Sequence, residues 1–102
     1  MSLNLNTRIV STSPYTVVNG DDVIFINIPG PSSVILPATA NEGASEKRSF
    51  YIKDFSGLAQ TNPIIITSAG GKTIDGTSFA ILNGGYSYIH VIYDGINWKI
   101  IS

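Results

Sequence analysis

Short runs of β-forming residues alternate with turn residues along the whole chain. No stretch places apolar residues at helical spacing over the roughly eleven positions that a helix needs, whereas Val, Ile, Tyr, Phe and Thr recur between Gly, Pro, Asn and Asp. This pattern predicts an all-β fold. The expected strands are Tyr15–Val18, Asp22–Ile28, Ser33–Leu36, Ser49–Lys53, Pro63–Thr67, Lys72–Ile74, Phe79–Leu82, Tyr86–Tyr93 and Asn97–Ile101.

Residues with turn chemistry separate these strands. Asp94-Gly95 lies between two runs of β-formers and predicts that the last quarter of the chain is an antiparallel hairpin. Asp54 and Ser56 can cap a tight turn through hydrogen bonds from side chain to backbone, and Gly57 supplies a permissive backbone. The segment Pro37–Lys47 is expected to be a long loop or a single helical turn.

Several strands carry apolar residues on both faces. In Asp22–Ile28 one face has Val23 and Phe25, and the other has Ile24, Ile26 and Ile28. One face packs inside the domain and the other needs a cover, which we expect to be a second sheet plus a neighbouring subunit. Residues 15–102 are therefore predicted to form a small antiparallel β-sandwich or jelly-roll-like domain, with Trp98 as a large lid over one face.

The segment 1–14 has a different character. Leu3, Leu5 and Ile9 stand in a polar background without a turn to fold them back. Such a segment has too little apolar area to fold by itself. We therefore expect residues 1–14 to form an extended N-terminal arm that becomes ordered on a partner or in a neighbour's sheet.

The composition adds an expectation of self-association. The chain has 102 residues, the size of one domain, and no cysteine, so disulfides are excluded. Charged residues make up 13% of it, about half the roughly 25% typical of soluble domains, while 43% are hydrophobic. A monomer with so little solvating charge would leave apolar surface open to water. We expect this surface to be buried in a homo-oligomer.

Charge and hydropathy also argue against two classes of partner. The net charge is −1 and the six basic residues are scattered rather than gathered in a patch, which argues against a nucleic-acid partner. No apolar run reaches the length of a membrane span, and the opening MSLNLNTRIV lacks the layout of a signal peptide. We expect a soluble protein that is made in a cytoplasm and has no membrane partner.

The candidate catalytic residues are few. His90 is the only histidine, and by alternation it shares a strand face with Tyr86 and Tyr88, where a packed or hydrogen-bonded imidazole accounts for it. The Asp residues stand mostly beside Gly or Ser, so turn chemistry explains them better than a glycosidase pair or a calcium site. We therefore expect no enzyme activity, and no catalytic, cofactor-binding or metal-ligating residue.

The aromatic residues raise an alternative function. Five tyrosines and one tryptophan could stack on sugars, as in a glycan-binding module. Aromatic side chains on strands usually pack against neighbouring strands or subunits, which favours a protein contact surface. The candidate interface residues come from the first segment and from one strand: Leu3, Leu5, Ile9, Tyr86, Tyr88 and His90.

Four motifs follow one another in a fixed order: LPA, IKDxSGxAxxNPI, GxTIDG and DGxxW. With the strands before them they occupy Tyr15–Val18, Asp22–Asn27, Val34–Ala38, Tyr51–Thr67, Gly70–Gly76 and Tyr93–Ile101. This order resembles a module that recurs in the virion proteins of tailed bacteriophages, in tail fibres, spikes and head-surface proteins. The resemblance covers about nine tenths of the chain.

The resemblance implies a small β domain, commonly trimeric, that is displayed on a virion after synthesis in the host cytoplasm. The module fills nearly the whole sequence, which favours a separate capsid decoration or cement protein that binds other virion proteins such as the major capsid protein. A small tail-fibre or spike component that binds a host-surface glycan is the runner-up.

Overall fold

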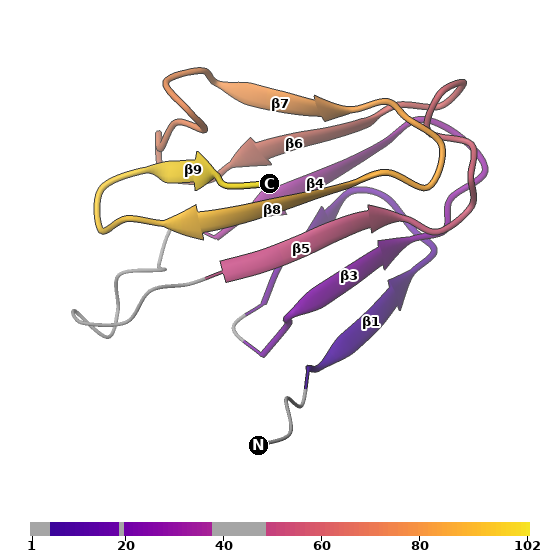
Figure 1. Cartoon of the computed structure of the whole chain (residues 1–102), viewed down its shortest axis with the longest axis horizontal. Helices are drawn as coiled ribbons and strands as arrows, with labels where there is room; N and C mark the ends of the chain where they lie inside the picture. The colour runs from indigo at the N-terminus through magenta and orange to yellow at the C-terminus, as the bar shows by residue number, and fades with distance from the viewer. Residues whose placement is uncertain (1–4, 19, 38–48) are drawn as a thin grey trace.

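The computed structural model describes residues 5–18, 20–37 and 49–102. Within these ranges all the regular secondary structure consists of β-strands, which confirms the all-β prediction (Figure 1). The strands are β1 (Thr7–Val10), β2 (Tyr15–Thr16), β3 (Val23–Ile26), β4 (Ser32–Leu36), β5 (Ser49–Asp54), β6 (Ile64–Ser68), β7 (Phe79–Leu82), β8 (Tyr88–Tyr93) and β9 (Trp98–Ile100).

The strands form two sheets that pack on each other as in a β-sandwich. One sheet has five strands in the order β1-β3-β5-β8-β9, and the other has four in the order β2-β4-β6-β7. In the described part of the chain no helix is long and apolar enough to cross a membrane.

Both sheets are mixed, which corrects the expectation of an antiparallel sandwich. Strands β1, β3 and β5 are parallel, as are β2, β4 and β6, whereas β7, β8 and β9 join antiparallel. The reason is that the first six strands alternate between the two sheets. Two parallel neighbours need a long crossover, and here a strand of the opposite sheet supplies it. The turn residues before Tyr15 therefore carry the chain from one sheet to the other.

Part of the segment expected to be an arm lies in the chain's own sheet. Thr7–Val10 form β1, which pairs in parallel with β3, and the Val10 side chain is only 4% exposed. Leu3 lies outside the described residues, as does the expected loop from position 38 onward. Over Thr7–Val10 the structure thus differs from an arm that pairs only with a partner.

The C-terminal hairpin is confirmed. Strands β8 and β9 pair antiparallel, with Tyr93 opposite Trp98, and the connecting turn uses Gly95 at a φ of 104°. The Asp94 carboxylate accepts backbone hydrogen bonds from Ile96 and from the residue after it, so it fixes this turn. The expected strand at Lys72–Ile74 is absent from the named strands, and its last residue forms only isolated bridges.

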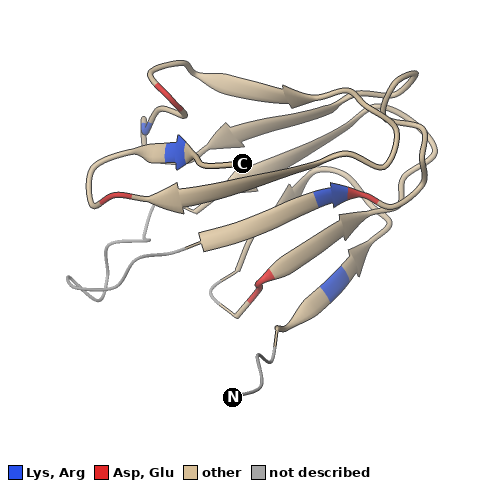
Figure 2. Cartoon of the chain, viewed as in Figure 1, with Lys and Arg blue, Asp and Glu red and all other residues tan. Residues whose placement is uncertain are grey.

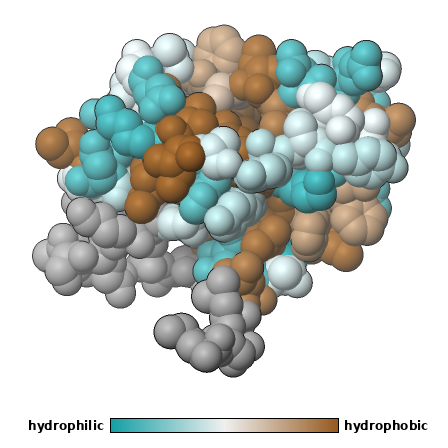
Figure 3. Space-filling view, viewed as in Figure 1, coloured by the Kyte–Doolittle hydropathy of each residue, from teal (hydrophilic) through white to brown (hydrophobic). Residues whose placement is uncertain are grey.

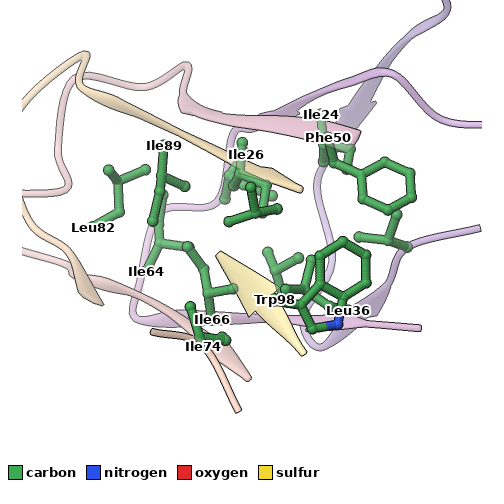
Figure 4. Packing of buried hydrophobic residues seen from close by; sticks show 14 of the residues in the cluster. Ile24, Ile26, Leu36, Phe50, Ile64, Ile66, Ile74, Leu82, Ile89 and Trp98 are labelled. Carbon is green, nitrogen blue, oxygen red and sulfur yellow. The ribbon is translucent and has the colours of Figure 1, made fainter. Parts of the chain in front are cut away.

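One hydrophobic core lies between the two sheets. Side chains that alternate along the strands point inward from both layers and meet there (Figure 4). Trp98 is 0% exposed and lies at 5.7 Å from Phe50 and 5.2 Å from Tyr93, measured between ring centroids. The other side chains of each strand point outward, so each sheet also has an outer face. No further layer formed by the described part of the chain packs on these outer faces.

Candidate functional site

The outer face of the five-stranded sheet is rich in aromatic side chains, and we call it the aromatic face. In the strand register, Val23 lies beside Tyr51 and Tyr51 beside His90, while Lys53 lies between Phe25 and Tyr88 on the next row. Brown hydrophobic side chains open to solvent are visible in Figure 3 between white and teal ones. By alternation, the strand residues of this face are Thr7, Ile9, Val23, Phe25, Ser49, Tyr51, Lys53, Tyr88, His90, Ile92 and Lys99.

Three rings form the centre of this face. The rings of Tyr51 and His90 are stacked, with centroids 3.8 Å apart and planes 14° from parallel, and Tyr88 lies 6.1 Å from Tyr51. Beside them is a pocket of about 220 Å³ lined by Tyr51, Tyr88, Lys53, Val23 and Leu5. A pocket with mainly apolar walls and one amino group at its side can accept an apolar group of a partner.

His90 also forms a polar contact on this face. Its Nε2 lies 2.7 Å from the Ser49 Oγ, and burial lowers the pKa of the imidazole, which favours the neutral ring. A serine beside a histidine is one part of nucleophilic catalysis, but among the described residues no carboxylate hydrogen-bonds to this ring to orient it. The geometry is that of a stacked and hydrogen-bonded imidazole on a half-buried face.

Tyr86 stands at the end of this face in an unusual backbone conformation. Its φ is 61°, a left-handed value that is rare for a bulky residue, and its side chain is 62% exposed. The Tyr86 N–H donates to the Asp54 Oδ2 over 3.0 Å, and the Lys53 ammonium donates to the Tyr86 carbonyl. The ring lies over Gly57, where an added Cβ would come within 2.5 Å of the Tyr86 Cζ. The aromatic ring is thus exposed and held in place.

Asp54 provides the anchor for this arrangement. Its side chain is 1% exposed and accepts hydrogen bonds from the Ser56 N–H and hydroxyl, the Ala59 N–H and the Tyr86 N–H. Burial alone would raise the pKa of this carboxyl, but the hydrogen bonds outweigh burial and lower it. The predicted turn around Ser56 and Gly57 is confirmed, and it also positions Tyr86.

The structure brings the described candidate interface residues to one side of the molecule. Ile9, Tyr88 and His90 share the aromatic face, Leu5 lines its pocket and Tyr86 stands at its end. Leu3 lies outside the described residues.

Among the strand residues of this face, only Ile9, Tyr88 and His90 are interface candidates predicted from the sequence, and the others, including Tyr51 and Lys53, were missed. The alternation in Ser49–Asp54 puts Tyr51 and Lys53 opposite buried Ile52, and this was a signal that they share a face. The pairing that sets this strand beside Val23 and His90 joins residues far apart in sequence, and no local pattern encodes it.

The comparisons with known proteins leave the family open. No protein-family model matches the chain. No curated protein matches it either. Within the ranges that the structure covers, no three His, Asp or Glu side chains gather as a metal ion would require. The aromatic face presents rings, aliphatic groups and the amino groups of Lys53 and Lys99 on its outer side.

Proposed function

We propose that this chain is a non-enzymatic structural protein of a bacteriophage virion, a trimeric decoration or cement protein on the particle surface. The observation that carries the proposal is the aromatic face, where Leu5, Ile9, Tyr86, Tyr88 and His90 come together from separate parts of the chain. Exposed tyrosines on a rigid sheet are typical of the anchors of protein interfaces.

Two further observations support the proposal. The chain is poor in charge, at 13%, as expected where a large part of the surface is covered in an assembly. The motif by which the chain resembles phage virion modules contains Asp54, Ser56, Gly57 and Ala59, and these residues belong to the network that holds Tyr86. In this proposal, the aromatic face attaches the protein to another virion protein such as the major capsid protein.

The first test is to measure the protein in purified particles by quantitative mass spectrometry. Hundreds of copies per particle would support a head decoration protein. A handful of copies would move the proposal to a tail fibre or spike, and absence from the particles would refute the virion proposal altogether.

The second test asks whether the aromatic face binds the particle. Tyr88→Ala should weaken co-sedimentation with particles that lack the protein by about tenfold or more, because a central aromatic anchor is lost. Ile96→Ala is the matched control, because Ile96 is 69% exposed but lies in the turn at the other end of β8. Circular dichroism of both variants would show that the fold is kept. Equal binding of the two variants would contradict this role of the face.

The same rings favour a second candidate function, a receptor-binding module of a fibre or spike. The exposed ring of Tyr88 beside the stacked Tyr51 and His90 could pack against the apolar face of a sugar. A glycan array separates the two functions. Selective glycan binding that Tyr88→Ala abolishes would favour the receptor-binding module. If the protein bound no glycan on the array, the function as a decoration protein would be favoured.

A further inference from the structure

The outer face of the four-stranded sheet has a different chemistry, and we call it the neutral face. Its residues lie opposite the buried side chains of β2, β4, β6 and β7. Phe79 and Ile81 are exposed there, at 47% and 48%, and Ile35 and Ile65 are half-buried. By alternation, the strand residues of this face are Thr16, Ser33, Ile35, Ile65, Thr67, Phe79 and Ile81.

The strands of this sheet carry no charged residue. Their sequences are YT, SSVIL, IIITS and FAIL, and β4, β6 and β7 are tan along their whole length in Figure 2. On the aromatic face, by contrast, the strands place Lys53 and Lys99 outward, and the only strand carboxylate of that sheet, Asp54, points inward. The two outer faces of the domain therefore differ in charge.

This difference indicates which face can meet a copy of itself. Two aromatic faces placed together would bring ammonium groups toward ammonium groups without a carboxylate from the strands to pair them. Two neutral faces meet no such repulsion, and the depletion of charge is what distinguishes the centre of an interface between identical subunits. An uncharged face also lacks charged groups that could orient a different protein through complementary charges.

The rows across the neutral face suit packing against an identical face. In the register, Ile65 lies between Ser33 and Ile81, and Phe79 stands at the end of the row that contains Ile35.

We propose that the neutral face is the self-association surface of the protein, and that its occupant is a further copy of this chain. The inference rests on the proposed function for the expectation that copies assemble. It adds a division of labour: the four-stranded sheet joins the copies, and the aromatic face is left free for the virion partner. Around a three-fold axis, Ile81 and Phe79 of each copy would point toward the other copies.

The test is the oligomeric state of charge-introducing variants by sedimentation equilibrium. Ile81→Glu should raise the dissociation constant by about 100-fold or more, because it buries an unpaired charge within the contact. The controls Ile96→Glu, off both faces, and Tyr88→Glu, on the aromatic face, should assemble like the wild type. Assembly of Ile81→Glu like the wild type, or dissociation of Tyr88→Glu alone, would overturn the inference.

Cross-linking covers the case in which Ile81→Glu does not fold. The chain has no cysteine, so Ile81→Cys introduces its only thiol, and a short bis-maleimide should join two such copies about tenfold faster than two Ile96→Cys copies. Equal rates would overturn the inference. A wild-type protein that is monomeric but present on particles would also overturn the inference, and it would leave the virion proposal standing. An oligomeric protein that is absent from particles would refute the virion proposal and leave the inference about the neutral face standing.

Discussion

The Tyr86 N–H donates a hydrogen bond to the Asp54 Oδ2 across 3.0 Å, and this contact ties the turn after β5 to the segment that enters β8. The two segments are 32 residues apart in sequence. A buried carboxylate thereby fixes the position of an exposed aromatic ring. The stability of the fold and the presentation of the aromatic face consequently depend on the same side chain.

Asp54→Ala should destabilise the protein strongly. The change removes the acceptor for four donors in a site that is 1% exposed, so we expect a loss of roughly 3 to 5 kcal/mol in the free energy of unfolding. Asp54→Asn keeps one acceptor oxygen and should lose less. Urea denaturation of the three proteins at neutral pH measures the difference, and equal midpoints would contradict the role assigned to Asp54.

The same carboxylate predicts sensitivity to acid. The pKa of Asp54 is lowered in the folded state from its ordinary value of 3.8. The stability that Asp54 contributes is therefore present above pH 3.8 and is lost as the pH falls through the folded pKa. Between pH 6 and pH 2 the wild type should lose more stability than Asp54→Asn. If the difference in free energy of unfolding between the two proteins stayed constant over this pH range, the prediction would be contradicted.

Trp98→Ala should open a large cavity. The ring is 0% exposed and lies between Phe50 and Tyr93, so we expect a loss of roughly 3 to 5 kcal/mol. Trp98→Phe is the control that keeps an aromatic ring in the site and should lose less. Thermal melts followed by circular dichroism measure both variants. An unchanged melt for Trp98→Ala would mean that the ring is not part of the core in solution.

Local patterns in the sequence predicted much of the fold. Alternation and turn residues located eight of the nine strands to within two residues at each end, the β8–β9 hairpin, and the turn that Asp54 caps. These features depend on neighbours in the chain, so the sequence carries them directly. Thr7–Val10 was missed as a strand because its edge position leaves three of its four residues exposed, which hides the alternation.

The parallel pairing and the make-up of the site could not be predicted in this way. A turn between two strands has similar residues whether the chain reverses within one sheet or crosses to the other, so the sequence predicted antiparallel pairing for β2 to β6 as well. The stack of Tyr51 on His90 and the contact of Ser49 with His90 depend on the β5–β8 pairing, which is set by the whole fold. Alternation predicted which side chains share one face of a strand, but it could not predict which strands lie next to that strand in the sheet.

Tyr15 predicts a loss of stability in alkali. Its hydroxyl donates to the Asp21 Oδ2 over 2.5 Å, and Arg8 Nε donates to the Oδ1 over 2.9 Å. Burial, and then the hydrogen bond to Asp21, raise the pKa of Tyr15 from 10.0 to about 12. A raised pKa gives stability that is present below pH 10 and lost as the pH rises through 12. Tyr15→Phe should lack this component, so its stability should converge with that of the wild type between pH 10 and pH 12.

Two neighbouring residues of β1 test whether this strand belongs to the folded domain or to an arm. Val10 is 4% exposed and packs in the core, whereas Ile9 is 59% exposed on the aromatic face. Val10→Ala should therefore lower the free energy of unfolding by about 2 kcal/mol, and Ile9→Ala should leave it within about 0.5 kcal/mol of the wild type. Urea denaturation of the isolated protein measures both. An arm that becomes ordered only on a partner predicts instead that neither change affects the unfolding midpoint, so equal midpoints for the two variants and the wild type would remove β1 from the folded domain.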